Sequence, residues 1–240
     1  MYNAKVIRIN GTRRDVFEIA TKACRELGWY YCGFQTNPFA SEGMKTIAFE
    51  VCEQMGWSAP DRIVFPVGTG SGIVGCWMGL RVLKQLGWIE KLSSLGCIRP
   101  EGCSPIVRAH EQGSGQIEAV DKPKTAAEAL MIGHPLKGKI VLRALNETKG
   151  FARSVSDDEI VDAAKLLAKS EGLFVEPSSA ASIAGLRRLL EEGKIDPEER
   201  VVCILRGTGL KTIETYSDSV RRSTEIYPSI DQLRRLLEET

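Results

Sequence analysis

The feature that most constrains this chain is a buried strand that runs directly into a glycine-rich loop and then into a helix. The stretch is FPVGTGSGIVG, residues 65–75. Glycines let the backbone turn sharply and approach a ligand, and the N–H groups at a helix start attract an anion. Hydroxyl groups in the loop add further donors. We therefore predict a phosphate-binding loop at the carboxyl end of the strand. Its residues are Gly68, Thr69, Gly70, Ser71 and Gly72.

Two familiar phosphate loops do not match this stretch. A Walker A loop requires Gly-Lys-Ser/Thr, and the loop contains no lysine. The dinucleotide fingerprint Gly-x-Gly-x-x-Gly fails because the third glycine is misplaced. A plain strand-to-helix turn remains open as an alternative, since glycine often marks such turns.

Strand and helix patterns alternate along the rest of the chain. Apolar runs predict strands over 62–67, 95–98 and 201–205. Helical periodicity predicts helices over 13–27, 42–56, 73–87, 103–112, 125–132, 156–170 and 179–192, and a last one near residue 230. This alternation is typical of an α/β fold with a helix-covered, mostly parallel sheet.

The first 34 residues predict a smaller β-α-β unit. Residues 4–9 and 29–34 have strand patterns on either side of the helix over 13–27. Such a unit is too small to bury both faces of a sheet. The unpaired edge of the 4–9 strand would invite pairing, so we predict a homodimer or a complementing N-terminal chain bound there.

Composition and charge exclude several classes of protein. Lys and Arg number 32 against 31 for Asp and Glu, so no nucleic-acid or acidic-membrane partner is expected. Apolar runs are far shorter than a membrane span, the N-terminus does not resemble a signal peptide, and a cytoplasmic protein is expected. The odd count of seven cysteines contains no Cys-x-x-Cys, and the two histidines have no supporting motif. We therefore predict no metal site and no catalytic residue.

Three other stretches add polar groups at predicted element ends. Arg206, Gly207, Thr208 and Gly209 follow the strand over 201–205, so they are expected to face the same crevice as the first loop. Residues 174–182, FVEPSSAAS, predict a helix start with serine caps. Residues 37–46, NPFASEGMKT, form a polar turn that opens a helix.

In this order, the four stretches resemble the threonine synthase branch of the fold-type II pyridoxal-phosphate enzymes, which are related to the tryptophan synthase β subunit. The match runs from about residue 4 to 212 and corresponds to the C-terminal portion of the family. The resemblance implies pyridoxal 5′-phosphate as cofactor, with its phosphate held by residues 68–72. It also implies conversion of O-phosphohomoserine to threonine, with Asn37 contacting a phosphorylated or amino-acid ligand. Residues 1–50 would be a remnant of the smaller domain and 51–240 the large cofactor-binding domain.

Three departures from the family pattern bear on activity. The family's Schiff-base lysine lies in a region with no counterpart here, so we expect the chain to be inactive alone. Ala40 stands where the family often has an arginine for the substrate phosphate. Arg206 stands where the family has a threonine beside the pyridine nitrogen, and its charge would oppose a pyridinium.

These departures leave three hypotheses. The chain is an enzyme portion whose lysine comes from a missing segment, or it is a non-catalytic phosphate-ligand-binding module or subunit. The third hypothesis is a family member that acts on a different amino acid with a complementing chain.

Overall fold

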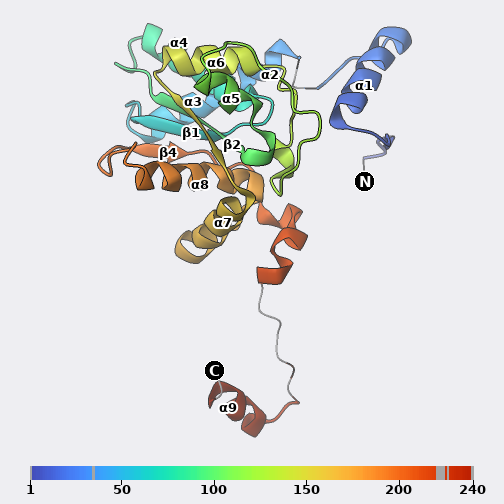
Figure 1. Ribbon diagram of the computed structural model, residues 1–240, viewed down its shortest axis with the longest axis vertical. Coiled ribbons are helices and arrows are strands. Elements are labelled where there is room, and N and C mark those ends of the chain that lie inside the picture. The colour runs from blue at the N-terminus through green and yellow to red at the C-terminus, as the bar shows by residue number, and fades with distance from the viewer. Residues whose placement is uncertain (1, 34–35, 220–224, 226, 239–240) are drawn as a thin grey trace.

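Four parallel strands form one sheet in the order β3-β2-β1-β4 (Figure 1). The computed structural model describes residues 2–33, 36–219, 225 and 227–238. The parallel, helix-covered sheet predicted from the sequence is confirmed. The strands are β1 (Arg62–Pro66), β2 (Ser94–Pro100), β3 (Phe151–Val155) and β4 (Val201–Cys203).

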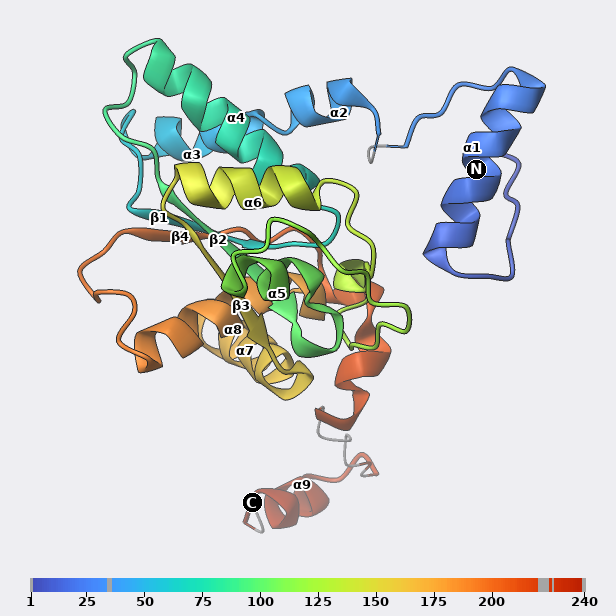
Figure 2. The ribbon, with the colours of Figure 1, turned by 45° about the horizontal axis from the view of Figure 1, so that its top comes forward.

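Helices cover both faces of the sheet (Figures 1 and 2). One face carries α2 (Pro38–Gly43), α3 (Thr46–Gln54), α4 (Ser71–Gln85), α5 (Pro105–Glu111) and α6 (Gly138–Glu147). The other face carries α7 (Asp157–Glu171) and α8 (Pro177–Glu191). Strand residues alternate between two apolar clusters, because Ile63 and Phe65 pack on the α4 side and Val64 on the α8 side.

Local sequence explains where α7 begins and ends. The Ser156 hydroxyl accepts a hydrogen bond from the Glu159 N–H at 3.2 Å, and the Glu159 carboxylate accepts one from the Ser156 N–H at 2.7 Å. This is the capping box predicted from the sequence. Gly172 ends the helix in the left-handed conformation, with φ at 68°.

The N-terminal β-α-β prediction is wrong in its strands. The helix α1 (Arg13–Leu27) is present, but residues 2–9 and 28–33 form no strand, and Phe34 lies outside the described residues. Among the described residues, no strand lies next to either segment. A single strand without a neighbour leaves its backbone N–H and C=O groups without hydrogen-bond partners, so no strand forms there. Residues 4–9 therefore present no unpaired strand edge to which a partner chain could pair. In both views α1 lies to one side of the sheet and its helices (Figures 1 and 2).

Two further differences concern the middle of the chain. The helix predicted over 125–132 is reduced to the short 3₁₀ turn η2 (Glu128–Leu130). The Asp157 carboxylate accepts hydrogen bonds from Thr125 Oγ1 and the Ala126 N–H. These hydrogen bonds compete with the backbone conformation that a helix starting at residue 125 would need. Conversely, the sequence pattern predicts no element over 133–155, where α6 and β3 lie.

The remaining short elements complete the chain. The helix predicted near residue 230 is confirmed as α9 (Ile230–Glu238). Three further 3₁₀ turns are η1 (Glu101–Cys103), η3 (Gly209–Lys211) and η4 (Ile213–Ser219). Across the described ranges, no helix has the length and apolar character needed to cross a bilayer.

Asp61 ties together the starting ends of three strands. Its carboxylate accepts hydrogen bonds from Lys91 Nζ at 2.6 Å and from the Arg200 N–H at 2.9 Å. The hydrogen bond from Lys91, with that from Arg200, lowers the pKa of Asp61. Asp61→Asn is expected to reduce the free energy of unfolding at neutral pH by about 1 kcal/mol, because the charge in both hydrogen bonds is lost.

The pH dependence of this difference follows from linkage. Because the pKa of Asp61 is lower in the folded chain, its stabilisation is present above the ordinary aspartate pKa and is lost as pH falls through the lowered value. Urea unfolding of both proteins at neutral and strongly acidic pH measures this. Equal stability of the two proteins at neutral pH would contradict it.

Candidate functional site

The glycine-rich loop lies at the carboxyl end of β1 and lines a small cavity. The Val67 N–H donates to the Ile98 carbonyl at 2.9 Å, which holds the start of the loop against β2. The cavity has a volume of about 20 Å³ and is partly open to solvent. Its lining consists of Pro66, Val67, Gly68, Thr69, Gly70, Ser71, Gly72, Ile73 and Arg206. A volume of this size holds one water-sized group, so a ligand would seat an oxygen atom there and extend toward the solvent.

The loop presents N–H groups without protein acceptors. Within the described part of the chain, the N–H groups of Gly68, Thr69 and Gly70 donate to no carbonyl or side chain. Those of Ser71 and Gly72 belong to the first turn of α4, where N–H groups have no intrahelical acceptor. A set of free N–H groups at a helix start is a site for an anion.

Two of the loop positions require glycine. Gly70 has a φ of 98°, and a Cβ there would lie 2.6 Å from Val141 Cγ2. A Cβ on Gly68 would lie 2.8 Å from the Ala129 carbonyl oxygen. The loop therefore packs directly against α6 on one side and against η2 on the other.

Arg206 brings a positive charge to the same cavity. Its N–H and that of Gly207 donate to the buried Ser179 hydroxyl at 3.0 and 2.9 Å, which fixes the turn after β4. One guanidinium nitrogen lies 3.5 Å from the Pro66 carbonyl oxygen. Desolvation lowers the pKa of Arg206, and the nearby Glu176 carboxylate opposes that shift. Of the four residues after β4 that are expected to face this crevice, Arg206 lines the cavity, whereas Gly207, Thr208 and Gly209 are not part of its lining.

Asn37 is engaged elsewhere. Its Oδ1 accepts a hydrogen bond from the Phe39 N–H at 3.0 Å and so caps α2, while its Nδ2 donates to the Tyr30 hydroxyl at 3.1 Å. Asn37 does not line the small cavity. The structure thus groups residues 68–72 with Arg206 and leaves Asn37 apart from them.

Two residues beside the loop are absent from the sequence-based candidates. Arg99 is fully buried beneath the loop, and a charged residue that ends an apolar strand is a signal that could have found it. Lys137 is 8% exposed, and its Nζ donates to Ser41 Oγ at 2.5 Å. Burial lowers the pKa of Lys137. No pattern in the sequence indicates that Lys137 is buried.

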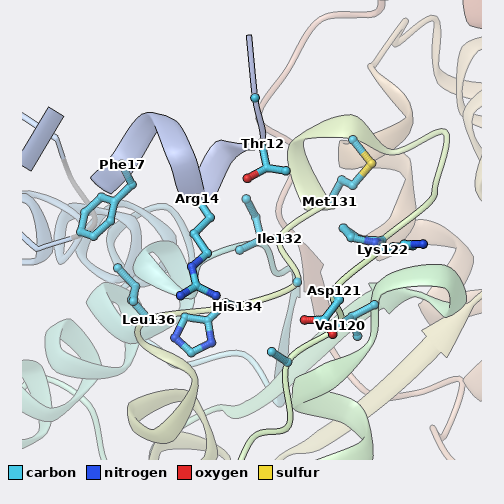
Figure 3. A pocket seen from close by; sticks show the side chains of 14 residues that line it. Thr12, Arg14, Phe17, Val120, Asp121, Lys122, Met131, Ile132, His134 and Leu136 are labelled. Atoms are coloured by element: carbon cyan, nitrogen blue, oxygen red, sulfur yellow. The ribbon is translucent and has the colours of Figure 1, made fainter. Parts of the chain in front are cut away.

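A larger cavity of about 640 Å³ lies between α1 and the segment 119–136 (Figure 3). Apolar side chains such as Phe17 and Leu136 line it together with Arg14 and His134. Figure 3 shows Arg14 extending from α1 toward His134. Ile132 lines this cavity and also lies 3.5 Å from where a Gly68 Cβ would be, so the two hollows are neighbours.

The fold and the site together define a class of protein. A loop of free N–H groups and a guanidinium meet at the carboxyl edge of a parallel, helix-covered sheet, which is where α/β proteins hold phosphorylated ligands. Comparison with known sequences identifies the family. Residues 1–207 match the family model described as pyridoxal-phosphate dependent enzyme, and the chain belongs to that family.

Curated relatives narrow the resemblance to threonine synthases. The chain is 41% identical over 238 residues to threonine synthase of Methanocaldococcus jannaschii, and 40% identical over 237 residues to that of Methanosarcina acetivorans. Each match covers 99% of this chain and 58% of the relative. The chain therefore spans little more than half the length of these relatives. The resemblance to the threonine synthase branch is confirmed.

A solved structure supports the same fold. Maize serine racemase superposes with a TM-score of 0.72 at 19% identity, over 99% of this chain and 65% of the racemase. Such identity concerns the fold alone, which is that of the fold-type II pyridoxal-phosphate enzymes. The family depends on pyridoxal phosphate, and the sequence-based prediction of the cofactor is confirmed.

Proposed function

We propose that this chain forms the cofactor-phosphate side of a threonine-synthase-like active site. The supporting observation is that five loop residues, 68–72, and the Arg206 guanidinium line one small cavity whose N–H groups lack protein acceptors. The family reaction that the resemblance implies is the conversion of O-phosphohomoserine to threonine. When bound, pyridoxal phosphate supplies an aldehyde and an electron-withdrawing ring.

Each residue of the cavity has a proposed part in binding. The N–H groups of residues 68–72 donate to the cofactor phosphate. The Thr69 and Ser71 hydroxyls lie 3.4 Å apart and hydrogen-bond each other, so together they leave one further donor for it. Arg206, which the family pattern would put beside the pyridine nitrogen, lines the loop cavity in this structure, and we propose that it neutralises part of the phosphate charge. Asn37 remains the proposed substrate contact at the start of α2, outside this cavity.

We propose that these 240 residues do not complete the reaction by themselves. The resemblance matches no lysine of this sequence to the Schiff-base lysine of the family. Lys45 is paired with Glu42 at 2.6 Å, and Lys137 donates to Ser41. A complementing chain would supply the amine, because a second copy of this chain would carry the same lysines. Residues 1–50 would be part of the smaller domain, and the protein would be located in the cytoplasm.

Borohydride reduction tests where the amine lies. The chain is mixed with pyridoxal phosphate, its visible spectrum is recorded, and it is then reduced and analysed by peptide mass mapping. We expect saturable binding that inorganic phosphate competes away, and no stoichiometric lysine adduct. The same treatment of the chain unfolded in urea measures the nonspecific labelling of exposed lysines, which serves as the background.

A single stoichiometric adduct would contradict the proposal. If the adduct fell on Lys137, the buried amine of lowered pKa would be the reacting group, because a desolvated lysine is a better nucleophile. If pyridoxal phosphate did not bind at all, the cofactor-phosphate site itself would be wrong.

A further inference from the structure

Arg99 is an arginine with no surface exposure and no acidic partner among the described residues. It lies near the end of β2, and its guanidinium reaches beneath the glycine-rich loop. Its hydrogen-bond partners are backbone carbonyls from three segments and one sulfur. They are the carbonyl oxygens of Val67 (2.9 Å), Gly68 (2.6 Å), Cys103 (2.7 Å), Leu130 (3.3 Å) and Ile132 (2.7 Å), and Cys103 Sγ (3.2 Å).

The contacts to Val67 and Gly68 set the direction of two N–H groups. A trans peptide unit is planar, so its N–H points opposite to its carbonyl. No cis peptide bond occurs in the described chain. Because Arg99 draws the Val67 and Gly68 carbonyls inward, the N–H groups of Gly68 and Thr69 turn away from it. These two N–H groups have no protein acceptor and belong to residues that line the small cavity.

The same guanidinium also holds the wall against which the loop packs. Its bonds to Leu130 and Ile132 secure η2, and the Ala129 carbonyl of that turn lies where a Gly68 Cβ would be, at 2.8 Å. Arg99 thus fixes the loop and its support in one arrangement. Its uncompensated charge also makes the loop a more favourable place for an anion.

We propose that Arg99 is the positioning residue of the phosphate loop, which orients the N–H groups of Gly68 and Thr69 toward the phosphate of a bound ligand. This inference rests on the proposed function, because it assumes that the loop binds phosphate. Arg99 itself does not contact the ligand. Its loss should therefore affect recognition of the phosphate group and spare the rest of the ligand.

Pyridoxal phosphate and pyridoxal, which lacks the phosphate, provide the test. Dissociation constants of both are measured by calorimetry for the unmodified chain, Arg99→Gln and Arg99→Lys. We expect the unmodified chain to prefer pyridoxal phosphate and Arg99→Gln to lose at least about tenfold of that preference, by analogy with residues that orient metal ligands. Arg99→Lys should lose less. Lysine keeps the charge but has three donors where arginine has five.

Arg62→Gln is the matched control. Arg62 pairs with Glu199 at the opposite end of β1, so its loss costs stability without touching the loop. We expect it to leave the preference unchanged. If Arg99→Gln does not fold, the Arg99→Lys ratio and the shifts of the Gly68 and Thr69 amide signals on titration with inorganic phosphate decide the matter.

The outcomes separate the two proposals. If the unmodified chain prefers pyridoxal phosphate and the Arg99 variants keep the full preference, Arg99 does not position the loop. If the unmodified chain binds both compounds equally, the phosphate site fails and the inference about Arg99 fails with it. A preference lost in Arg62→Gln as well would mean that general destabilisation, and not loop orientation, explains the result.

Discussion

Gly70→Ala is expected to weaken the binding of pyridoxal phosphate by about 100-fold or more. An alanine at a φ of 98° carries backbone strain of about 1–3 kcal/mol. Its Cβ would also lie 2.6 Å from Val141 Cγ2, so that either the loop or Val141 has to shift. A shift of the loop moves the N–H groups that start α4, so that they no longer converge on one point. Calorimetric titration with pyridoxal phosphate measures the loss.

Gly172→Ala separates strain from ligand binding. Gly172 ends α7 with a φ of 68°, and a Cβ there would meet no atom within 4 Å. This variant therefore has a similar backbone cost far from the loop. We expect it to lower the unfolding free energy by about 1 kcal/mol and to leave the dissociation constant unchanged. If Gly70→Ala bound pyridoxal phosphate as tightly as the unmodified chain, the loop would not be part of the binding site.

Reversing the charge of Arg206 is the second large effect. Arg206→Glu places a carboxylate at the cavity where a phosphate with nearly two negative charges would sit. At a separation of about 6 Å and an effective dielectric constant of about 40, the change from attraction to repulsion amounts to several kcal/mol. We expect the affinity for pyridoxal phosphate to fall by at least about 100-fold, and the affinity for pyridoxal to change far less.

Arg187→Glu makes the same change of net charge at a distant place. Arg187 is exposed on α8 and lies 3.9 Å from Glu191. We expect no change in affinity for this variant, and a reduced salt dependence of binding for Arg206→Glu alone. Arg206→Lys should retain most of the binding. If Arg206→Glu bound as tightly as the unmodified chain, Arg206 would face the cavity without taking part in phosphate binding.

The sequence predicts the parts of this fold whose signals are local. The run from 62 to 75 identifies β1, the loop and α4 because apolar residues, glycines and helical periodicity follow each other without interruption. The capping box at Ser156 identifies α7 for the same reason. The predicted strands at 4–9 and 29–34 fail because a strand depends on a neighbour, which periodicity within the strand cannot reveal.

The candidate site is predictable to a similar extent. Residues 68–72 and Arg206 follow apolar strands, and parallel strands end at one edge, so their meeting could be expected. Arg99 and Lys137 could not be predicted in this way, because what sets them apart is their burial and their hydrogen bonds to carbonyl or hydroxyl groups far away in the sequence. Arg99 reaches from β2 to Ile132, and Lys137 reaches Ser41, 96 residues away. Neither distance is visible in spacing or composition.

The pairing of β1 with β4 has a consequence for synthesis of the chain. Arg206 reaches Pro66 across 140 positions, so the cation joins the loop only after more than 200 residues have left the ribosome. A nascent polypeptide that ends before β4 holds the glycines without the guanidinium and without the strand beside β1. We therefore expect vitamin B6 phosphate to be captured by chains in which β4 has already emerged and folded, and not by shorter translation intermediates.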